Sequence, residues 1–401
     1  MGHNPTGGVL PLERRRQLYA LCSKYDVIII EDDPYWYLQY PSAAAEEARS
    51  RGLPPPPASS SSEEEDTSTT TAAANTQERK SGYAFLDSLE PSYLSIDVDG
   101  RVVRLDTFSK TVAPGCRMGW MTAAPAIIER LLRINEASTQ QPSGFVQVVV
   151  AGALMGTQPA SARAGFAAAL QRAGLSPRAR DTFAGWRVDG WVRWLEGLRA
   201  EYERRMVAMC RALDDGAHEL KHQTPVRPAD ADWGVITKTR LFDFRWPRGG
   251  MFVWLRMRFE THPLWGVPRA DGSSRRTGGD DDAAAAVVVD GVALCTALFV
   301  LLTRKPHLVV VSPGLMFSAT EAVAAARGWA HYRLCFAAED GADEVAACSR
   351  RFAEGVRRFW RVKRVAELER LLEGAPGSED ANATAAQRED LDFVPAACMG
   401  C

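Results

Sequence analysis

The sequence lacks any apolar run of the roughly 18–20 residues that a membrane-spanning helix needs. Its longest candidate, Val292 to Leu302, is too short for that and predicts a buried helix. The sequence also lacks an excess of charge of either sign, because 48 Lys and Arg residues stand against 50 Asp and Glu residues. The formal net charge of −2 argues against a general nucleic-acid-binding surface and against a polybasic membrane surface.

Cysteine is too sparse for a disulfide scaffold, with eight residues in a chain of 401. We therefore expect a reducing compartment and take the cytoplasm as the location. A chain of this length can bury a sizeable core, so its stability need not depend on disulfides or on a metal. We expect no metal site.

Several stretches contain too little apolar surface to offset the entropy lost on ordering. The clearest lies within residues 42–82, where runs of Pro, Ser, acidic residues and Thr follow one another. We expect this stretch to be a disordered low-complexity insert. Two further polar inserts are expected near residues 222–248 and 262–286, and residues 374–401 are expected to form a mobile tail.

Short β-branched runs alternate with helical patterns along the rest of the chain. Val27 to Ile30 and Val102 to Leu105 are typical of strands buried on both faces of a sheet. Alternation of strands and helices predicts the α/β class. Further strands are predicted over 251–257, 308–311 and 331–337, and helices over 12–22, 125–156, 195–213, 292–303 and 343–373.

Polar residues follow the first two of these strands, at the sheet edge where α/β proteins bind their ligands. Lys110 follows the second strand, and a desolvated lysine has a lowered pKa and can form a Schiff base. Asp32 follows the first strand and could pair with a protonated ring nitrogen, while Tyr35 could hydrogen-bond a ring oxygen. The site could therefore hold an aldehyde cofactor.

The same segment carries groups suited to a phosphate. Arg117 supplies the planar, bidentate donor, and Thr107 and Ser109 supply hydroxyl groups. Each residue taken alone has a simpler explanation, such as a solvated lysine, a turn-forming aspartate or, for Arg333, an ion-pair partner on a sheet. The ordered combination is what favours a functional site.

Four short motifs in this order resemble the class I/II pyridoxal-phosphate aminotransferases of fold type I. The segment from Glu31 to Tyr40 is similar to the branch that holds fungal aromatic amino acid, kynurenine and 2-aminoadipate aminotransferases. The motifs are Asn4-Pro5-Thr6-Gly7, Asp32-Asp33-Pro34-Tyr35, Ser109-Lys110 with Arg117, and Arg333-Leu334-Cys335-Phe336.

The resemblance implies an α/β fold of the fold type I pyridoxal-phosphate-dependent transferases. We expect a partial large domain with a mostly parallel sheet and a C-terminal α+β small domain. We also expect an N-terminally truncated member, because the family carries a phosphate loop upstream of the asparagine motif. The expected domains are 1–41 with 83–190 for cofactor binding, 191–373 for the small domain, and the insert and tail given above.

The resemblance also implies a role for each matching residue. Lys110 would be the catalytic Schiff-base lysine, with Asp32 and Tyr35 as the other catalytic residues. Arg333 and Asn4 would bind the substrate. The implied cofactor-binding set is Asn4, Asp32, Tyr35, Thr107, Ser109, Lys110 and Arg117.

The expected function is ping-pong transfer of an amino group from an aromatic or long-chain L-amino acid to a 2-oxo acid, with pyridoxal 5′-phosphate as cofactor. We expect a homodimer in the intact family member and neither a nucleic-acid nor a membrane partner. One alternative is a catalytically inactive fragment that retains the fold. A transcription regulator with an aminotransferase-like domain, or a β-lyase or decarboxylase on the same scaffold, is also open.

Overall fold

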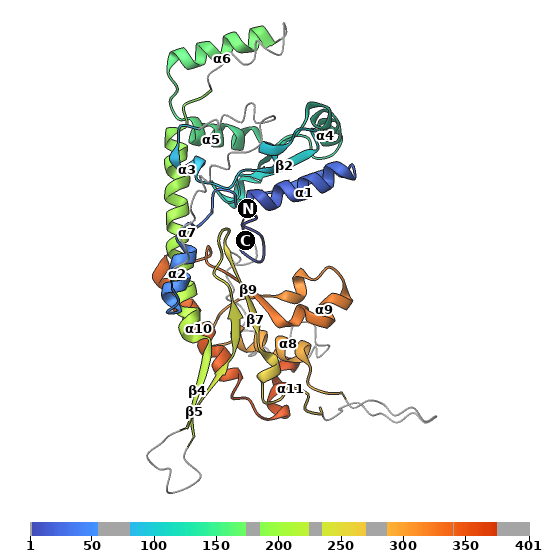
Figure 1. The fold of residues 1–401 in the computed structure, drawn as a ribbon, viewed down its shortest axis with the longest axis vertical. Helices are drawn as coiled ribbons and strands as arrows, with labels where there is room; N and C mark the ends of the chain where they lie inside the picture. The colour runs from blue at the N-terminus through green and yellow to red at the C-terminus, as the bar shows by residue number, and fades with distance from the viewer. Residues whose placement is uncertain are drawn as a thin grey trace, which may run out of the picture. The chain divides into compact units, whose positions relative to one another are not determined.

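The computed structural model describes residues 2–54, 81–173, 185–223, 235–269, 287–339 and 341–374. Within these ranges the chain divides into two units (Figure 1). Unit 1 holds residues 2–3, 8–40 and the described residues from 81 to 201. Unit 2 holds residues 4–7, 41–54 and the described residues from 202 to 374.

A three-stranded sheet lies in unit 1 in the order β1-β2-β3. Its strands are β1 Ile29–Asp32, β2 Val102–Thr107 and β3 Gly119–Thr122. β1 and β2 are parallel, with Asp32 opposite Leu105, which agrees with the predicted α/β class. β3 is antiparallel to β2. This pair differs from the mostly parallel sheet that we expected. A parallel pair requires a crossover connection, and the segment between β2 and β3 contains no helix long enough to form one.

Two clusters of buried side chains hold unit 1 together. Tyr19 of α1 packs with Tyr93 and Val102, and its hydroxyl group accepts hydrogen bonds from two backbone N–H groups of the loop before β2. Phe85 and Leu195 belong to the second cluster. The helices are α1 Leu12–Lys24, α3 Ala84–Asp87, α4 Pro125–Ala137, α5 Gly144–Met155, α6 Ala160–Ala173 and the first half of α7 Asp189–Gly216, with 3-10 turns at Tyr93–Ile96 and Pro114–Cys116.

An antiparallel sheet of four strands lies in unit 2 in the order β6-β7-β9-β8. Trp254 in β7 and Ser312 in β8 both lie opposite Arg333 in β9. A separate ribbon pairs β4 with β5. The strands are β4 His218–Gln223, β5 Val235–Arg240, β6 Phe242–Phe244, β7 Phe252–Met257, β8 Ser312–Pro313 and β9 His331–Cys335.

Helices pack on this sheet to form the core of unit 2. α8 begins after Asp290, whose carboxylate accepts a hydrogen bond from the N–H group of Ala293 and so caps the helix. The ring of Phe242 lies 5.8 Å from that of Phe352 in α10, and both are fully buried. The helices are α2 Ala43–Ser50, α8 Gly291–Thr303, α9 Glu321–Arg327, α10 Ala342–Phe359, α11 Val365–Glu373 and the second half of α7, with 3-10 turns at Phe259–Thr261, Gly314–Phe317 and Gly328–Ala330.

The prediction of a disordered insert over 42–82 is wrong for its beginning. Residues 43–50 form α2, in which Ala43 and Ala48 are buried. The N–H and hydroxyl groups of Ser42 both donate to Glu203, which anchors the start of this helix. The alanine-rich composition of this segment resembles that of a low-complexity stretch. Only the tertiary packing shows that Ala43 and Ala48 are buried. Residues 55–80 lie outside the described ranges.

Three further predictions about local structure need correction. Residues 222–248 are not irregular throughout, since β5 and β6 lie there. The strand predicted at 308–311 is displaced to β8, which is only two residues long. The helix predicted at 343–373 is two helices, α10 and α11.

Two polar segments predicted from the sequence are only partly covered by the structure. Within the insert near 262–286, residues 262–269 are described and include the buried His262 and Leu264. Residues 270–286 and 375–401 lie outside the described ranges. Over the described helices, none is both long and apolar enough to cross a membrane.

Candidate active site

The first part of the site lies where the two parallel strands of unit 1 end. Asp32 is the last residue of β1, and Thr107 is the last residue of β2. Because parallel strands end at the same edge of a sheet, both residues lie at that edge. Alternation along β1 buries Glu31 and leaves Asp32 exposed.

A buried ion network fixes these strand ends. Glu31 binds Arg15 over 2.8 Å, and both side chains are fully buried. Arg104 in β2 makes two hydrogen bonds to Asp106, of 2.8 and 2.9 Å, and lies 3.6 Å from Asp33. Burial raises the pKa of the Asp33 carboxyl group. Breaking buried charge pairs of this kind is strongly unfavourable, so the network holds β1 and β2 in register.

Lys110 and Tyr35 lie close to each other at this edge. The Nζ atom of Lys110 is 5.9 Å from the centre of the Tyr35 ring. Tyr35 is buried and Lys110 is half-buried. A primary amine and a phenol group thus converge from the ends of two neighbouring strands.

The hydroxyl groups expected to bind a phosphate also lie together. The Oγ1 atom of Thr107 is 3.0 Å from the Oγ atom of Ser109 and accepts a hydrogen bond from the Ser109 N–H group over 3.1 Å. Arg117 is exposed, adopts a left-handed backbone conformation with φ of 45°, and donates one hydrogen bond of 3.3 Å to the Pro114 carbonyl oxygen. The turn between β2 and β3 therefore presents two hydroxyl groups and a guanidinium group.

The second part of the site lies in unit 2 around Arg333. Its Nη1 atom donates a hydrogen bond of 2.9 Å to the Oδ1 atom of Asn4, and its Nη2 atom donates one of 3.3 Å to the hydroxyl group of Ser312. The guanidinium carbon lies 4.1 Å from the ring centre of Phe252 and 4.9 Å from that of Phe317. Two hydrogen bonds and two flanking aromatic rings therefore hold the Arg333 side chain in place.

The turn that carries Asn4 is itself fixed to unit 2. The carbonyl oxygen of Gly7 accepts hydrogen bonds from the N–H groups of Arg248 and Gly249, at 2.8 and 3.2 Å. Gly7 has φ of +67°, and a methyl group there would lie 2.4 Å from the Cβ atom of Pro247. Only glycine fits both the backbone conformation and the space.

The structure thus divides the predicted site residues into two groups. Asn4 and Arg333 lie in unit 2 and are hydrogen-bonded. The sequence did not indicate Ser312 or Phe317 as neighbours of Arg333, because neither belongs to a recognisable motif. The group in unit 1 comprises Asp32, Tyr35, Thr107, Ser109, Lys110 and Arg117.

Residues 2–172 match the sequence model of a family described as aminotransferase class I and II. An L-tyrosine:2-oxoglutarate aminotransferase of Tapinella panuoides is 32% identical over 68% of this chain and 38% of its own length. An aromatic amino acid aminotransferase of Schizosaccharomyces pombe is 36% identical over 53% of this chain and 33% of its own length.

Solved structures give the same result for the fold. The aminotransferase Aro8 of Candida albicans is 26% identical, with a TM-score of 0.52 over 90% of this chain and 56% of that one. The aromatic aminotransferase Aro9 of the same organism shares the fold with a TM-score of 0.54 at 22% identity, over 90% of this chain and 55% of that one. The chain therefore spans less than half the length of these curated relatives and just over half that of the solved structures.

Proposed function

We propose that this chain, whose residues 2–172 match the model of the class I and II aminotransferase family, transfers the amino group of an L-amino acid to a 2-oxo acid with pyridoxal 5′-phosphate as cofactor. The observation that carries the proposal is the placement of Lys110 beside Tyr35, at the end of a parallel strand pair. A half-buried primary amine next to a phenol group is what an aldehyde cofactor requires.

The residues of unit 1 fit this cofactor. Thr107, Ser109 and Arg117 would hold its phosphate group, because hydroxyl and guanidinium groups follow β2 within one turn. Asp32, exposed at the end of β1, would face its ring nitrogen, and the Tyr35 hydroxyl group its ring oxygen. When bound, the cofactor supplies an electron sink for the carbon that loses its proton.

The side chains of this chain would do the remaining work. The Lys110 amine would take the proton from the substrate Cα atom and deliver it to the C4′ atom of the cofactor. The Asp32 carboxylate would keep the cofactor ring nitrogen protonated by its negative charge. Arg333, held by Asn4 and Ser312, would bind the substrate carboxylate with its planar donors.

An aromatic L-amino acid as donor and 2-oxoglutarate as acceptor are our proposal for the substrate pair. It is supported by relatives that are named as tyrosine and aromatic amino acid aminotransferases. The homodimer and the cytoplasmic location that the sequence led us to expect are part of this proposal.

The test is amino-group transfer from L-tyrosine to 2-oxoglutarate by the purified chain supplied with pyridoxal 5′-phosphate. We expect turnover, loss of turnover in Lys110→Ala, and unchanged turnover in Lys24→Ala, which removes an exposed lysine of α1. A folded wild-type chain without turnover for any amino acid would support the inactive-fragment alternative instead.

A further inference from the structure

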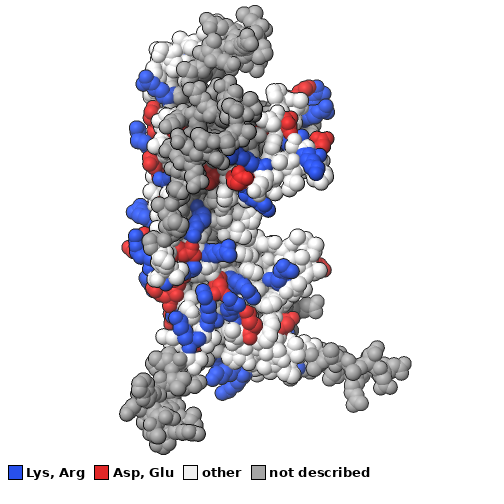
Figure 2. Space-filling view, in the orientation of Figure 1, with Lys and Arg blue, Asp and Glu red and all other residues white. Residues whose placement is uncertain are grey.

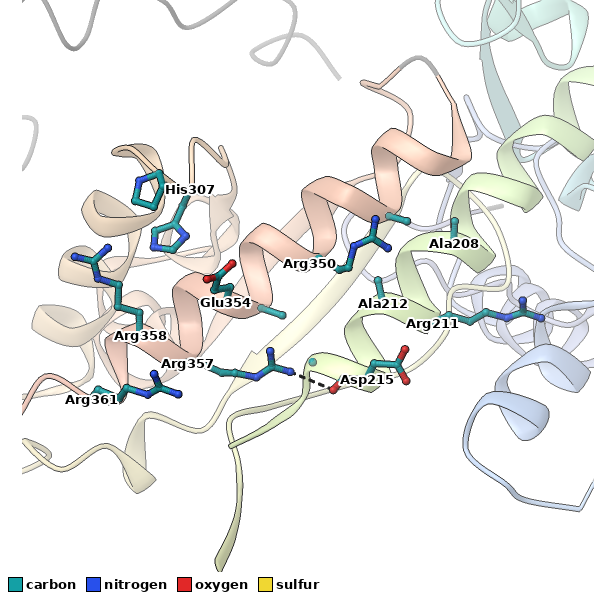
Figure 3. A pocket seen from close by; sticks show the side chains of 14 residues that line it. Ala208, Arg211, Ala212, Asp215, His307, Arg350, Glu354, Arg357, Arg358 and Arg361 are labelled. Atoms are coloured by element: carbon teal, nitrogen blue, oxygen red, sulfur yellow. Dashed lines mark hydrogen bonds between the residues drawn. The ribbon is translucent and has the colours of Figure 1, made fainter. Parts of the chain in front are cut away.

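Lys and Arg side chains are prominent on the visible face of unit 2 (Figure 2). One group of arginines surrounds a cavity of about 840 Å³ between the second half of α7 and α10 (Figure 3). The two helices approach closely at its floor, since a methyl group on Gly216 would lie 2.4 Å from the Cβ atom of Ala353. Longer side chains on both helices therefore stand above a floor of small residues.

The charge around this cavity is strongly one-sided. Two carboxylates, Asp215 and Glu354, line it against five arginines. A second cavity of about 390 Å³ shares two of these arginines and adds Arg304 and Arg370 against one carboxylate, Glu367. A hollow lined by one sign of charge concentrates the field and attracts counter-ions. The five arginines are Arg211, Arg350, Arg357, Arg358 and Arg361.

Two of the five arginines have no partner in the described part of the chain. Arg211 binds Glu46, and Arg361 binds Glu219. Arg357 donates to the carbonyl oxygens of His218 and Asp215 (Figure 3). The guanidinium groups of Arg350 and Arg358 make neither a hydrogen bond nor an ion pair with any described residue, and both are exposed.

The arginines of α10 repeat at helical spacing. Arg357 and Arg358 lie in the last turn of α10, and Arg361 follows in the turn after the helix. All three line the cavity, and their like charges repel one another. Arg350 lies about two turns earlier, which spreads the arginines of α10 over about 12 Å of the helix. Glu354 is the one carboxylate of α10 that lines the larger cavity. A bound anion would relieve this repulsion.

A buried histidine gives a second and independent observation. His307 lines the larger cavity and is only 3% exposed. Its Nε2 atom is buried and has no hydrogen-bond partner among the described residues. Burial and, secondarily, the nearby charge of Arg358 lower the pKa of His307. A buried polar atom of this kind normally has a partner, which a ligand oxygen would supply.

We propose that this cavity binds a small molecule that carries two or more phosphate groups. Guanidinium groups bind phosphate bidentately, and several arginines along about 12 Å of α10 suit several linked phosphates. The cavity volume is that of a small-molecule site. The net charge of −2 does not favour a nucleic acid, which needs a broad basic surface. The cavity shares no residue with the candidate active site.

The test is isothermal titration calorimetry of the full chain with sodium tripolyphosphate at constant ionic strength. We expect binding that weakens at least tenfold in the double variant Arg350→Gln/Arg358→Gln. The matched control is Arg16→Gln/Arg130→Gln, which removes the same charge from exposed positions in α1 and α4. The control should bind within twofold of the wild type. Both variants change exposed side chains only, so circular dichroism should show both folded.

Three results would overturn the proposal. The first is no binding of tripolyphosphate by the wild type, or equal weakening in the two double variants. The second is loss of binding in Arg117→Gln but not in Arg350→Gln/Arg358→Gln, which would place the ligand at the candidate cofactor site. The third is binding to a macromolecular or membrane ligand alone. Binding only to a hexaglutamate peptide would identify an acidic protein partner, and binding only to phosphatidylcholine vesicles that contain phosphatidylinositol bisphosphate would identify a membrane.

Discussion

The Nη1 atom of Arg333 donates a hydrogen bond of 2.9 Å to the Oδ1 atom of Asn4, which lies 329 positions earlier in the chain. Asn4 comes from a turn fixed by Gly7, and Arg333 from the centre of a sheet strand. The rings of Phe252 and Phe317 flank the guanidinium group. These contacts fix its orientation in advance, which reduces the entropy lost when it binds a carboxylate.

Arg333→Lys tests this orientation. We expect KM for the amino acid and for the oxo acid to rise about 10- to 100-fold with a smaller change in kcat, because a charged hydrogen bond contributes about 1.5–3 kcal/mol. Arg256→Lys is the control, since Arg256 lies on the neighbouring strand and its ion pair within the described ranges is a distant one of 3.7 Å to Glu260. Equal changes in KM for both variants would contradict the role of Arg333.

Gly7→Ala tests the turn that carries Asn4. Gly52→Ala is a matched control, because Gly52 has φ of +65° with nothing within 4 Å of an added methyl group. The control should lower the free energy of unfolding by about 1–2 kcal/mol from the left-handed backbone alone. Gly7→Ala should lower it further and also raise KM, since the methyl group would collide with Pro247. Urea denaturation and steady-state kinetics measure both, and equal losses of stability would argue against the collision.

Asp32→Asn and Asp33→Asn separate two adjacent carboxylates. Asp32 is exposed at the end of β1, whereas Asp33 is buried beside Arg104. We expect Asp32→Asn to lower turnover about 10²–10³-fold, the usual effect of losing a charge that stabilises the transition state. Asp33→Asn should retain most of the turnover. The opposite order in steady-state rates would assign the ring-nitrogen contact to Asp33.

His262 predicts a pH dependence of stability in unit 2. Burial lowers its pKa from 6.5 to about 4, and its Nε2 atom lies 3.0 Å from the Phe359 carbonyl oxygen. Between pH 4 and 6.5 the folded state therefore binds fewer protons than the unfolded state. The stabilisation of the folded state by neutral His262 is complete above pH 6.5 and is lost as the pH falls toward 4. The loss should reach about 3 kcal/mol.

The measurement is the free energy of unfolding as a function of pH. In His262→Gln this part of the pH dependence should disappear, while His3→Gln, an exposed position, should keep the wild-type slope. Identical slopes in all three proteins would mean that His262 does not stay neutral in the folded state.

Local sequence predicted the two parallel strands of unit 1, but each ends two residues later than expected, and Ile30 in β1 is exposed rather than buried. Val102 to Leu105 is recognisable because an apolar β-branched run has few other interpretations, and Lys110 follows it directly. The pairing of Arg333 with Ser312 and Phe317 was not predictable, because β8 is two residues long and only tertiary contacts position it. The whole of α2 was missed for the same reason.

The arginine-lined cavity shows a similar limit. Arg350 and Arg357 lie seven residues apart, a helical spacing that is visible in the sequence and is typical of an ordinary solvated helix face. The cavity exists because Gly216 and Ala353 let α7 and α10 approach closely, and that contact joins segments far apart in the chain.

The most direct test of the central claim is an absorbance titration of the purified chain with pyridoxal 5′-phosphate, followed by borohydride reduction and peptide mass analysis. We expect a visible band that saturates, with the cofactor mass retained on the peptide that contains Lys110. Lys110→Ala should give neither signal, and Lys24→Ala should give both. A saturating band in Lys110→Ala, or a folded wild-type chain with no band, would contradict the assignment of Lys110 as the residue that holds the cofactor.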